Sequence, residues 1–410
     1  MKNIPFCGFC AAVAVLCGTA FAEGEVTGKP HSLEDIEAIP YKTVNGQSIT
    51  GTGDIAIPGA GDYKAAVSVA DFGAVGDGVT DDTAAIAAAA GAAKAAKKPL
   101  YFPKTASGST YLVSAPLALT DGMAVSSALG VKLKASAGDA LTVGGTGVTV
   151  ANLTLSAADG SGIVVSGAAN VRIRDVIVSA SGADGISLAD ATNVWITGAA
   201  VKGAGAKGIR LGAGTQDVKI RGCLVSGYAD NIFFEASAAN VVIADNQITD
   251  GTNGLSGYGW HEGAPNSDVT VANNIFRACG VNLAGGLRMV FSGNTFLAFA
   301  GNAVAFKVTG EAGHPFRDSV IADNTFGSFD DAYSNPTGAL VVDGAEKVVI
   351  RGNALRREAI NGKAITGTGK VDIVVSNSTK VAVTGNSVEG AVDISSGNTG
   401  VTASGNAVEP

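Results

Sequence analysis

The segment Val171-Arg-Ile-Arg174 recurs along the chain as Val218-Lys-Ile-Arg221 and Val348-Val-Ile-Arg351. Similar segments begin at regular intervals from about residue 148 to the C-terminus. The first ones are separated by 23, 23, 24 and 23 residues and begin at Val148, Val171, Val194, Val218 and Val241. A fixed period in the range of about 20–50 residues indicates a solenoid, in which each repeat buries its apolar face against its neighbours. The sequence therefore predicts a stacked array of coils.

Each repeat is predicted to consist of strands and turns. Within the segments, β-branched apolar residues alternate with polar or small residues at period two, which is typical of strands. A leucine-rich horseshoe would show leucines at fixed positions, whereas this chain lacks that framework and contains 57 glycines. We therefore predict an all-β fold, a single-stranded parallel β-helix.

Asparagines follow the Val-x-Ile strand in many repeats, at Asn246, Asn274, Asn294, Asn324, Asn353, Asn386 and Asn406. An asparagine tolerates the left-handed backbone of a corner, and its amide can bond to the equivalent residue one coil away. We expect a structural asparagine ladder inside the coils and not a ligand-binding site.

Residues 1–22 have the pattern of an export signal. Met1-Lys2 provides a positive start, an apolar run follows from Phe6, and Ala20-Phe21-Ala22 has the small-x-small pattern of a cleavage site. The protein is therefore expected to be secreted, periplasmic or at the cell surface. The net charge of −8 and the lack of a Lys/Arg run argue against nucleic acid and anionic membranes as partners, and the apolar run is too short to insert as a membrane span.

Cleavage would leave two of the five cysteines, Cys223 and Cys279. They are predicted to lie two coils apart, which is about 10 Å along the axis and beyond the reach of a disulfide bond. Two free, buried thiols are expected.

Residues 23–65 form a separate, polar leader. Its stretch Lys42-Thr-Val-Asn-Gly-Gln-Ser-Ile-Thr-Gly-Thr-Gly-Asp-Ile-Ala-Ile57 resembles a short adaptor phrase of phage tail fibres. Two short strands of this kind cannot form a core alone, so the leader is expected to associate with a partner chain or with the solenoid.

The stretch Asp71-Phe-Gly-Ala-Val-Gly-Asp-Gly-Val-Thr-Asp-Asp-Thr-Ala-Ala-Ile86, followed by Leu100-Tyr-Phe-Pro103, resembles the N-terminal signature of the pectate-lyase-like superfamily. That superfamily includes phage tailspikes, polygalacturonase-like enzymes and alginate epimerases. The resemblance implies a right-handed parallel β-helix over residues 66–410.

The same stretch predicts an N-terminal capping α-helix near residues 80–98. Thr80 is expected to be its N-cap, and Pro99 would stop it. A helix laid across the open end of a solenoid would protect that end from aggregation. The paired carboxylates Asp81 and Asp82 are interpreted as helix-capping groups in preference to a catalytic pair.

Candidate ligand-binding residues come from aligning the strands of successive coils. With Ile186, Ile209, Ile232, Leu255 and Val304 pointing inward, the residues expected to point outward are Ser187, Arg210, Phe233, Ser256 and Ala305. Glu235 and Lys307, two residues further on, are expected to share that outer face.

Two insertions break the repeat near this strip. Gly257-Tyr-Gly-Trp-His-Glu-Gly-Ala-Pro265 contributes Tyr258, Trp260, His261 and Glu262, and Gly310-Glu-Ala-Gly-His-Pro-Phe-Arg-Asp318 contributes His314 and Arg317. Irregular loops on a rigid repeat scaffold commonly carry binding groups, and aromatic faces beside charged groups suit a polysaccharide. The predicted substrate-binding residues are Arg210, Phe233, Tyr258, Trp260, Lys307, His314 and Arg317. Each of them also has a structural reading, as a packing group or a solvated charge.

Several reactions remain open. Glycoside hydrolysis would use the carboxyl groups of Glu235 and Glu262, whereas a lyase or epimerase would use a base such as His261, Arg210 or Lys307. The Asp-Pro-His-Asp run of alginate epimerases and the Gly-Asp-Asp and Gly-His-Gly pairs of polygalacturonases are missing from the chain.

We therefore expect a secreted polysaccharide-binding β-helix protein, either a glycoside hydrolase or a polysaccharide lyase. The alternative is a non-catalytic adhesin or a receptor-binding protein of the phage tailspike or tail-fibre kind, which would imply a homotrimer. No cofactor or metal site is predicted, although a lyase would be expected to use calcium.

Overall fold

The chain divides into two units, Met1–Lys64 and Ala65–Pro410. The computed structural model describes residues 66–179, 182–235, 237–258, 260–261, 264–298, 304–310, 313–327, 338–356, 371–394 and 397–408, all of which belong to the second unit. The predicted signal peptide and leader lie outside the described residues.

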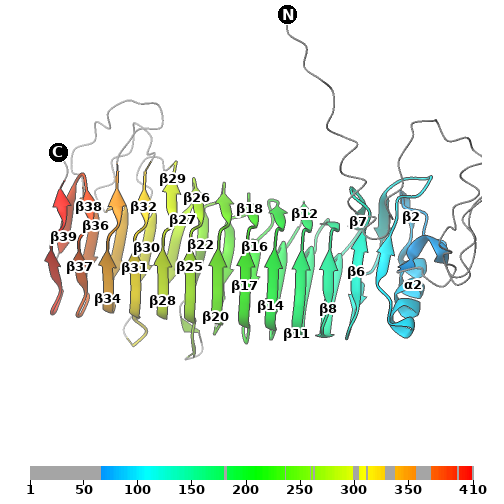
Figure 1. Ribbon diagram of the computed structural model, residues 1–410, viewed down its shortest axis with the longest axis horizontal. Coiled ribbons are helices and arrows are strands. Elements are labelled where there is room, and N and C mark those ends of the chain that lie inside the picture. Colours follow the sequence, from blue (N-terminus) through cyan, green and yellow to red (C-terminus); the bar gives the residue numbers. More distant parts are fainter. Residues whose placement is uncertain are drawn as a thin grey trace, which may run out of the picture. The chain divides into compact units, whose positions relative to one another are not determined.

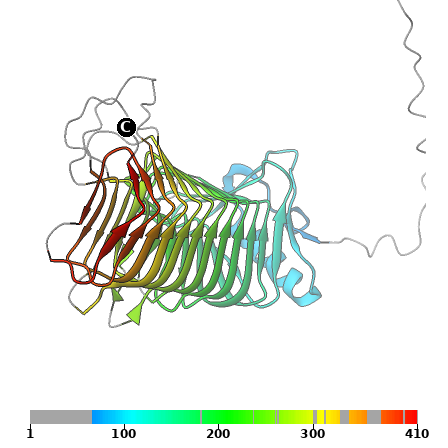
Figure 2. The ribbon, with the colours of Figure 1, turned by 60° about the vertical axis from the view of Figure 1, so that its left-hand side comes forward.

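The second unit is a parallel β-solenoid in which each coil contributes short strands to three sheet faces (Figures 1 and 2). We name the faces A, B and C. On these faces, equivalent strands of successive coils pair in parallel, for example Val171 with Val194 and Val194 with Val218. The prediction of a parallel β-helix is confirmed.

Face A contains the Val-x-Ile strands. They are β1 (Val67–Ser68), β3 (Leu100–Phe102), β6 (Ala124–Ser127), β9 (Thr149–Ala151), the second half of β11 (Ile163–Arg174), β14 (Thr192–Thr197), β17 (Gln216–Arg221), β20 (Ala239–Ala244), β25 (Ser267–Ala272), β28 (Gly286–Ser292), β31 (Phe316–Ala322), β34 (Ala345–Arg351), β37 (Ala382–Thr384) and β40 (Thr402–Ser404).

Face B follows the corner at the end of each face A strand, where the later coils carry the asparagines. Its strands are β2 (Asp77–Asp81), β4 (Thr110–Val113), β7 (Lys132–Ala135), β10 (Thr154–Ala157), β12 (Ile177–Ser179), β15 (Ala200–Lys202), β18 (Leu224–Ser226), β21 (Gln247–Thr249), β26 (Ile275–Arg277), β29 (Thr295–Leu297), β32 (Thr325–Phe326), β35 (Ala354–Leu355), β38 (Ser387–Val388) and β41 (Ala407–Val408).

Face C completes the coil. Its strands are β5 (Leu117–Leu119), β8 (Leu141–Thr146), the first half of β11, β13 (Ile186–Ala189), β16 (Lys207–Leu211), β19 (Asp230–Phe234), β22 (Asn253–Tyr258), β27 (Gly280–Ala284), β30 (Phe306–Thr309), β33 (Leu340–Asp343), β36 (Val371–Ser376) and β39 (Ala391–Ile394). Because β11 runs through the corner between faces C and A, it pairs with neighbours on both.

The core lies between the three faces and is built from stacked side chains. Val171, Ile173 and Val178 are fully buried, as are the matching residues of neighbouring coils. Aromatic residues stack in the same way further along, where the Phe276 and Phe296 ring centroids are 4.8 Å apart. Apolar side chains at identical positions therefore remove each other from water, which is the main stabilising contribution expected in such a fold.

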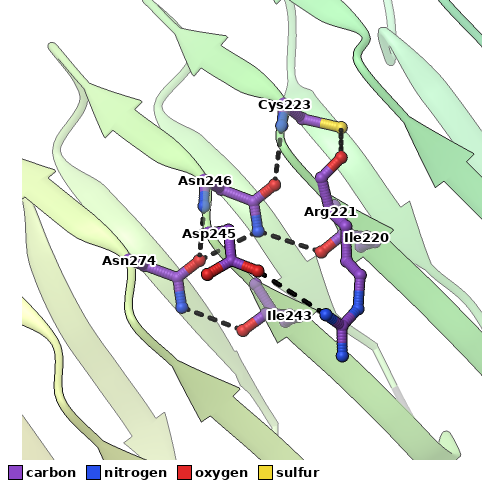
Figure 3. A network of polar contacts seen from close by, with 7 residues as sticks. All are labelled: Ile220, Arg221, Cys223, Ile243, Asp245, Asn246 and Asn274. Carbon is purple, nitrogen blue, oxygen red and sulfur yellow. Dashed lines mark hydrogen bonds and ion pairs between the residues drawn. The ribbon is translucent and has the colours of Figure 1, made fainter.

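The asparagine ladder is present at the corner between faces A and B (Figure 3). The side-chain amide of Asn246 donates to Asn274 Oδ1 at 2.9 Å and to the backbone carbonyl of Ile220 at 3.0 Å. The same pattern links Asn274, Asn294, Asn324, Asn353, Asn386 and Asn406 in order. The corner residue just before each ladder position has a left-handed backbone, as at Asp245 (φ 59°) and Gly222 (φ 61°). The predicted structural role of these asparagines is confirmed.

Helix α2 (Thr83–Ala96) lies at the N-terminal end of the coils, beside β2 (Figure 1). Ile86, Ala89 and Ala93 are buried against the first strands, so the predicted cap is present. The prediction that Thr80 is the N-cap was wrong, because Thr80 belongs to β2 and the N-cap position is Asp82.

The two carboxylates at the start of α2 have separate roles. Asp82 accepts the backbone N–H groups of Val75 and Gly76, which fixes the preceding loop. Asp81 accepts the Thr83 N–H at 3.0 Å and the Ser114 hydroxyl at 2.6 Å. Asp82 occupies the N-cap position, but its side chain does not cap the helix, so the interpretation as a capping group was wrong for its carboxylate, whereas Asp81 does bond the first N–H of the helix.

Cys223 and Cys279 are free and buried, as predicted. Across the described residues, no helix has the length and apolarity needed to span a membrane.

Candidate functional site

Outward side chains on face C form rows, because equivalent residues of successive coils are in register. Ser187 lies beside Arg210, Arg210 beside Phe233, and Phe233 beside Ser256. Adjacent members of a row are about 4.8 Å apart, which is the spacing of neighbouring strands. Charged and aromatic side chains therefore meet between coils that are distant in sequence.

The predicted register was wrong for one later strand. Phe306, and not Val304, lies inward beside Val281, and the outward residue beside Asn282 is Lys307. Ala305 is buried in the corner before β30, where its carbonyl accepts the Val281 N–H. Strand alternation has period two, so a shift of two residues keeps the same faces and leaves the sequence pattern unchanged.

Arg210 forms the centre of a charged group on face C. Its guanidinium forms an ion pair with Glu235 of the next coil and lies 3.7 Å from Asp184 of the preceding coil. Asp184 is buried, whereas about a third of the Arg210 and Glu235 side chains is exposed. One cation is thus shared by two carboxylates from different coils.

A second charged group lies at the start of the same strands. Lys207 forms an ion pair with Asp230 of the next coil, and its ammonium lies 4.2 Å from the centroid of the Phe233 ring. Asp230 also accepts the Ser256 hydroxyl at 2.6 Å and the Asn253 amide at 2.7 Å. Ser256 points outward in register with Phe233, as predicted, but this contact covers it, so that only 4% of it is exposed.

Tyr258 completes the group. Its ring packs edge-on against Phe233, with centroids 5.8 Å apart and an interplanar angle of 86°. The Tyr258 side chain is 56% exposed, which is high for a large aromatic residue on a packed sheet. We call this set the face C cluster: Asp184, Lys207, Arg210, Asp230, Phe233, Glu235, Ser256 and Tyr258.

The surroundings shift the pKa values of two carboxyl groups in opposite directions. Burial raises the pKa of Asp184, and the nearby Arg210 charge opposes that effect only in part. Burial also acts on Asp230, but its hydrogen bonds from Lys207, Ser256 and Asn253 outweigh it and lower the pKa. Carboxyl groups whose pKa values are moved apart are candidates for acid and base roles.

The longer insertion forms a hairpin at the corner between faces C and A. Its strands β23 (Trp260–His261) and β24 (Ala264–Pro265) are antiparallel, with Trp260 paired to Pro265. The hairpin follows Tyr258 directly, so the chain brings its backbone next to the face C cluster. The side chains of Trp260 and His261, and all of Glu262, lie outside the described part of the structure.

The structure separates the other predicted residues from this cluster. Lys307 shares the outward row of Phe233 but lies three coils further along, after Ser256 and Asn282. Arg317 lies on face A, beside Glu346, and His314 is exposed in the turn before it. His314 and Arg317 therefore do not join Arg210 and Phe233 in one site.

Three residues of the face C cluster were missed from the sequence. Asp184, Lys207 and Asp230 each stand two positions before an inward apolar residue, in Asp184-Gly-Ile, Lys207-Gly-Ile and Asp230-Asn-Ile. Their spacing of 23 residues equals the repeat, so they fall in one row of alternating charge. This period is visible in the sequence, one residue before the Gly185, Gly208 and Asn231 positions at which the predicted strands begin.

The face C cluster does not fit a calcium ion. Asp184, Asp230 and Glu235 already contact Arg210 or Lys207, which a bound calcium ion would have to displace. Within the described ranges, no group of three or more His, Cys, Asp or Glu residues is placed to hold a metal ion.

The model of the right handed beta helix region matches residues 139–296 and, in a second overlapping match, residues 214–408. The chain belongs to the right-handed β-helix family. The β-helix begins with a stretch, residues 66–128, that matches the model of rhamnogalacturonase A/epimerase, pectate lyase-like proteins. No curated protein matches the chain.

Solved structures of the same fold come from phages and bacteria. The ORF18 protein of Geobacillus virus E2 is 15% identical with a TM-score of 0.58, over 72% of this chain and 62% of that one. The Dettilon tailspike protein is 18% identical with a TM-score of 0.56, over 83% and 69% of the two chains. The A-module of the mannuronan C-5 epimerase AlgE4 from Azotobacter vinelandii is 18% identical with a TM-score of 0.54, over 84% and 100%. At these identities the likeness is one of fold, and the β-helix spans less than two thirds of the ORF18 protein.

Proposed function

We propose that this β-helix binds a polysaccharide on face C, across the coils that carry the face C cluster. The observation that carries the proposal is the contact between Phe233 and Tyr258, because it places two aromatic rings beside paired charges on one exposed strip. Sugar rings pack their C–H surfaces on aromatic side chains and bond their hydroxyls to charged and amide groups. A tailspike and a mannuronan epimerase among the similar structures agree with a polysaccharide ligand.

The row geometry favours a polymer over a single sugar. The outward row continues from Phe233 through Ser256 and Asn282 to Lys307, one residue per coil. Coils about 4.8 Å apart offer a repeating set of contacts to a chain lying along the axis. We also propose that the protein works outside the cell, because residues 1–22 have the pattern of a cleaved export signal.

The binding proposal is tested with a panel of neutral and acidic polysaccharides and the variants Phe233→Ala and Tyr258→Ala. Loss of one stacking ring is expected to weaken binding about tenfold or more. The matched control is Phe72→Ala, which removes a partly exposed aromatic side chain at the N-terminal end of the coils, outside the face C cluster. Unchanged affinity in both cluster variants would show that the ligand, if any, binds elsewhere.

A second candidate function, glycoside hydrolysis, is favoured by the shared contact of Arg210 with Asp184 and Glu235. One guanidinium touching both groups keeps the two carboxyls within about 10 Å, the range that hydrolysis of a glycosidic bond requires. Asp184 would donate its proton to the leaving oxygen, and Glu235 would take a proton from the attacking water. The raised pKa of Asp184 suits a proton donor.

This reaction is tested separately from binding. Asp184→Asn and Glu235→Gln are expected to retain binding while abolishing the release of new reducing ends. Asp323→Asn, an exposed corner carboxylate outside face C, is the matched control. A protein that binds the polysaccharide but releases no reducing ends would be a binding protein only, and the two readouts distinguish these cases.

A further inference from the structure

A second surface lies on face A, on the coils of β11, β14 and β17. Arg172, Trp195 and Lys219 are adjacent in register, with the tryptophan in the middle. The Arg172 guanidinium carbon lies 4.4 Å from the centroid of the Trp195 ring, and the Lys219 ammonium lies 4.3 Å from it. The indole is therefore held between two cations, with 37% of its surface exposed.

The positions of these cations are set without neutralising them. Arg172 donates to the backbone carbonyls of Val171 and Asn193, each at 3.0 Å. The Trp195 ring N–H donates to Asn193 Oδ1 at 3.0 Å, which fixes the indole plane. Among the residues that the structure describes, neither Arg172 nor Lys219 forms an ion pair. Charges that are already in position lose little conformational entropy when they bind an anion.

The next outward row on the same strands is also basic. Arg174, Thr197 and Arg221 are adjacent in register, so a hydroxyl lies between two guanidinium groups. Arg174 is 3.9 Å from Asp175 and Arg221 is 3.5 Å from Asp245, and all four side chains are more than half exposed. Exposed pairs of this length contribute little, and an incoming anion can compete with them.

A shallow groove of about 500 Å³ continues from this array along face A. Its lining consists of side chains from four coils: Asn193, Asp217, Lys219, Asn240, Val242, Asp268 and Thr270. Asn193 and Lys219 belong to both the groove and the cationic array. The groove is therefore basic where it meets Arg172 and Lys219, and its remaining lining consists of amide and carboxylate groups together with the apolar Val242.

We propose that this part of face A is a binding site for an acidic saccharide, with its carboxylate or sulfate group held by Arg172 and Lys219 and its sugar hydroxyls bonded in the adjoining groove. Carboxylate and amide groups such as Asp217 and Asn240 bond hydroxyls well, and the carboxylates of Asp217 and Asp268 would repel a polymer with an anion at every step. A nucleic acid or an anionic membrane fits less well for that reason and because the chain has a net charge of −8.

This site does not rest on the proposed function of face C. Face A and face C are separate sheets of the same coils, joined through β11, and the two surfaces share no residue. A ligand on one surface can therefore be tested by variants that leave the other intact.

The experiment measures binding of the full chain to three size-defined probes: a dextran oligosaccharide with one terminal carboxylate, the same oligosaccharide with one terminal sulfate, and neutral dextran of equal length. Arg172→Gln and Lys219→Gln each remove one positioned charge while keeping a polar side chain. Each is expected to weaken binding of an acidic probe about tenfold, and more at low salt than at high salt. The matched control is Lys202→Gln, an exposed lysine of the same coil as Trp195 but on face B. Melting temperatures confirm that the variants are folded.

The outcomes separate the alternatives. The proposal is supported if the two face A variants lose affinity for an acidic probe while Lys202→Gln and Arg277→Gln, which changes an exposed arginine of face B, retain it. It is overturned if all four lose affinity equally, which would indicate non-specific charge attraction, or if neither acidic probe binds below about 1 mM. Binding of DNA or of phosphatidylglycerol vesicles that depends on Arg172 and Lys219, with no saccharide binding, would also overturn it.

Discussion

Asn246 accepts the backbone N–H of Cys223 through its side-chain oxygen at 2.9 Å, one coil away (Figure 3). The two residues occupy the same position in successive coils, and the asparagine ladder starts at this step. The coils before it have apolar residues at that position, Val176 and Ala199, whereas every later coil from Asn246 to Asn406 has an asparagine. The corner therefore changes from apolar packing to a hydrogen-bonded column at one defined point.

Removing an asparagine from the middle of the ladder should destabilise the fold. Asn294→Ala removes donations to Asn324 and to the Val271 carbonyl, and it takes from the Asn274 amide one of its two acceptors. We expect the free energy of unfolding to fall by about 1–3 kcal/mol, the cost of a buried polar group left unsatisfied. Urea unfolding measures this, with the exposed Asn282→Ala as control. Equal stability of the two variants would contradict a structural role for the ladder.

The start of the ladder can be moved by one coil. In Cys223→Asn, the new amide would lie next to Asn246 and near the Ile196 carbonyl, which the Cys223 thiol already contacts. We expect this variant to unfold within about 1 kcal/mol of the natural protein, because its polar groups find partners. Cys223→Asp places a charge in the same buried corner and should be much less stable. Equal stability of the aspartate and asparagine variants would show that hydrogen bonds between neighbouring corner side chains do not stabilise this corner.

The two thiols should be unreactive in the folded protein. Burial raises the pKa of Cys223 to about 11 and that of Cys279 to about 12, so almost no thiolate is present near neutral pH. Titration with a thiol reagent at pH 8 should label both residues only after denaturation. Rapid labelling of Cys223 or Cys279 in the folded protein would show that the coils around them open.

Acid should weaken the attachment of the capping helix. Hydrogen bonds from Ser114 and Thr83 lower the pKa of Asp81 from 3.8 to about 2. The stabilisation by its carboxylate is therefore complete above about pH 4 and is lost as the pH falls through 2. Asp81→Asn should lower the urea midpoint at neutral pH, and its difference from the natural protein should shrink below pH 4. A difference that is constant between pH 2 and pH 7 would exclude this cause.

Charge on the buried face of the same helix should be more damaging. Ile86 is almost fully buried against the first strands, so Ile86→Asp would place a carboxylate in a desolvated contact. We expect a lower melting temperature or aggregation, whereas Ala84→Asp on the exposed side of the helix should behave like the natural protein. Similar melting of both variants would mean that the helix does not cap the coils.

The repeat predicted most of the fold because each coil repeats the same local pattern. Val171, Val194 and Val218 fall at the same register position, and the ladder positions follow from the same period. The N-cap at Asp82 was not predicted, because Thr80 fits the same rule and only the loop at Val75 and Gly76 decides which residue starts the helix.

The candidate site was only partly predictable, because it depends on contacts between coils. The outward positions of Arg210 and Phe233 follow from alternation, but the pairing of Arg210 with Asp184 and Glu235 depends on side-chain direction. Alternation of inward and outward residues is the same after a shift of two residues along the strand. Lys307 was therefore predicted at the position of Glu235, whereas it lies in the row of Phe233. Trp195 is not among the predicted ligand residues, because the irregular insertions indicate face C only, although Arg172 precedes it and Lys219 follows it at the period of the repeat.

Parallel pairing in constant register also determines how such a protein can change in size. Removing residues 194–217 would let Val171 pair with Val218, and the residues after them would keep their corners and their inward faces. The shortened protein would bring Arg172 next to Lys219, without the indole between them. Duplication of the same segment would instead repeat Trp195 and Arg210 once more along the axis. Gain or loss of whole coils would thus change the number of outward side-chain rows by whole coils, while the architecture of each coil stays the same.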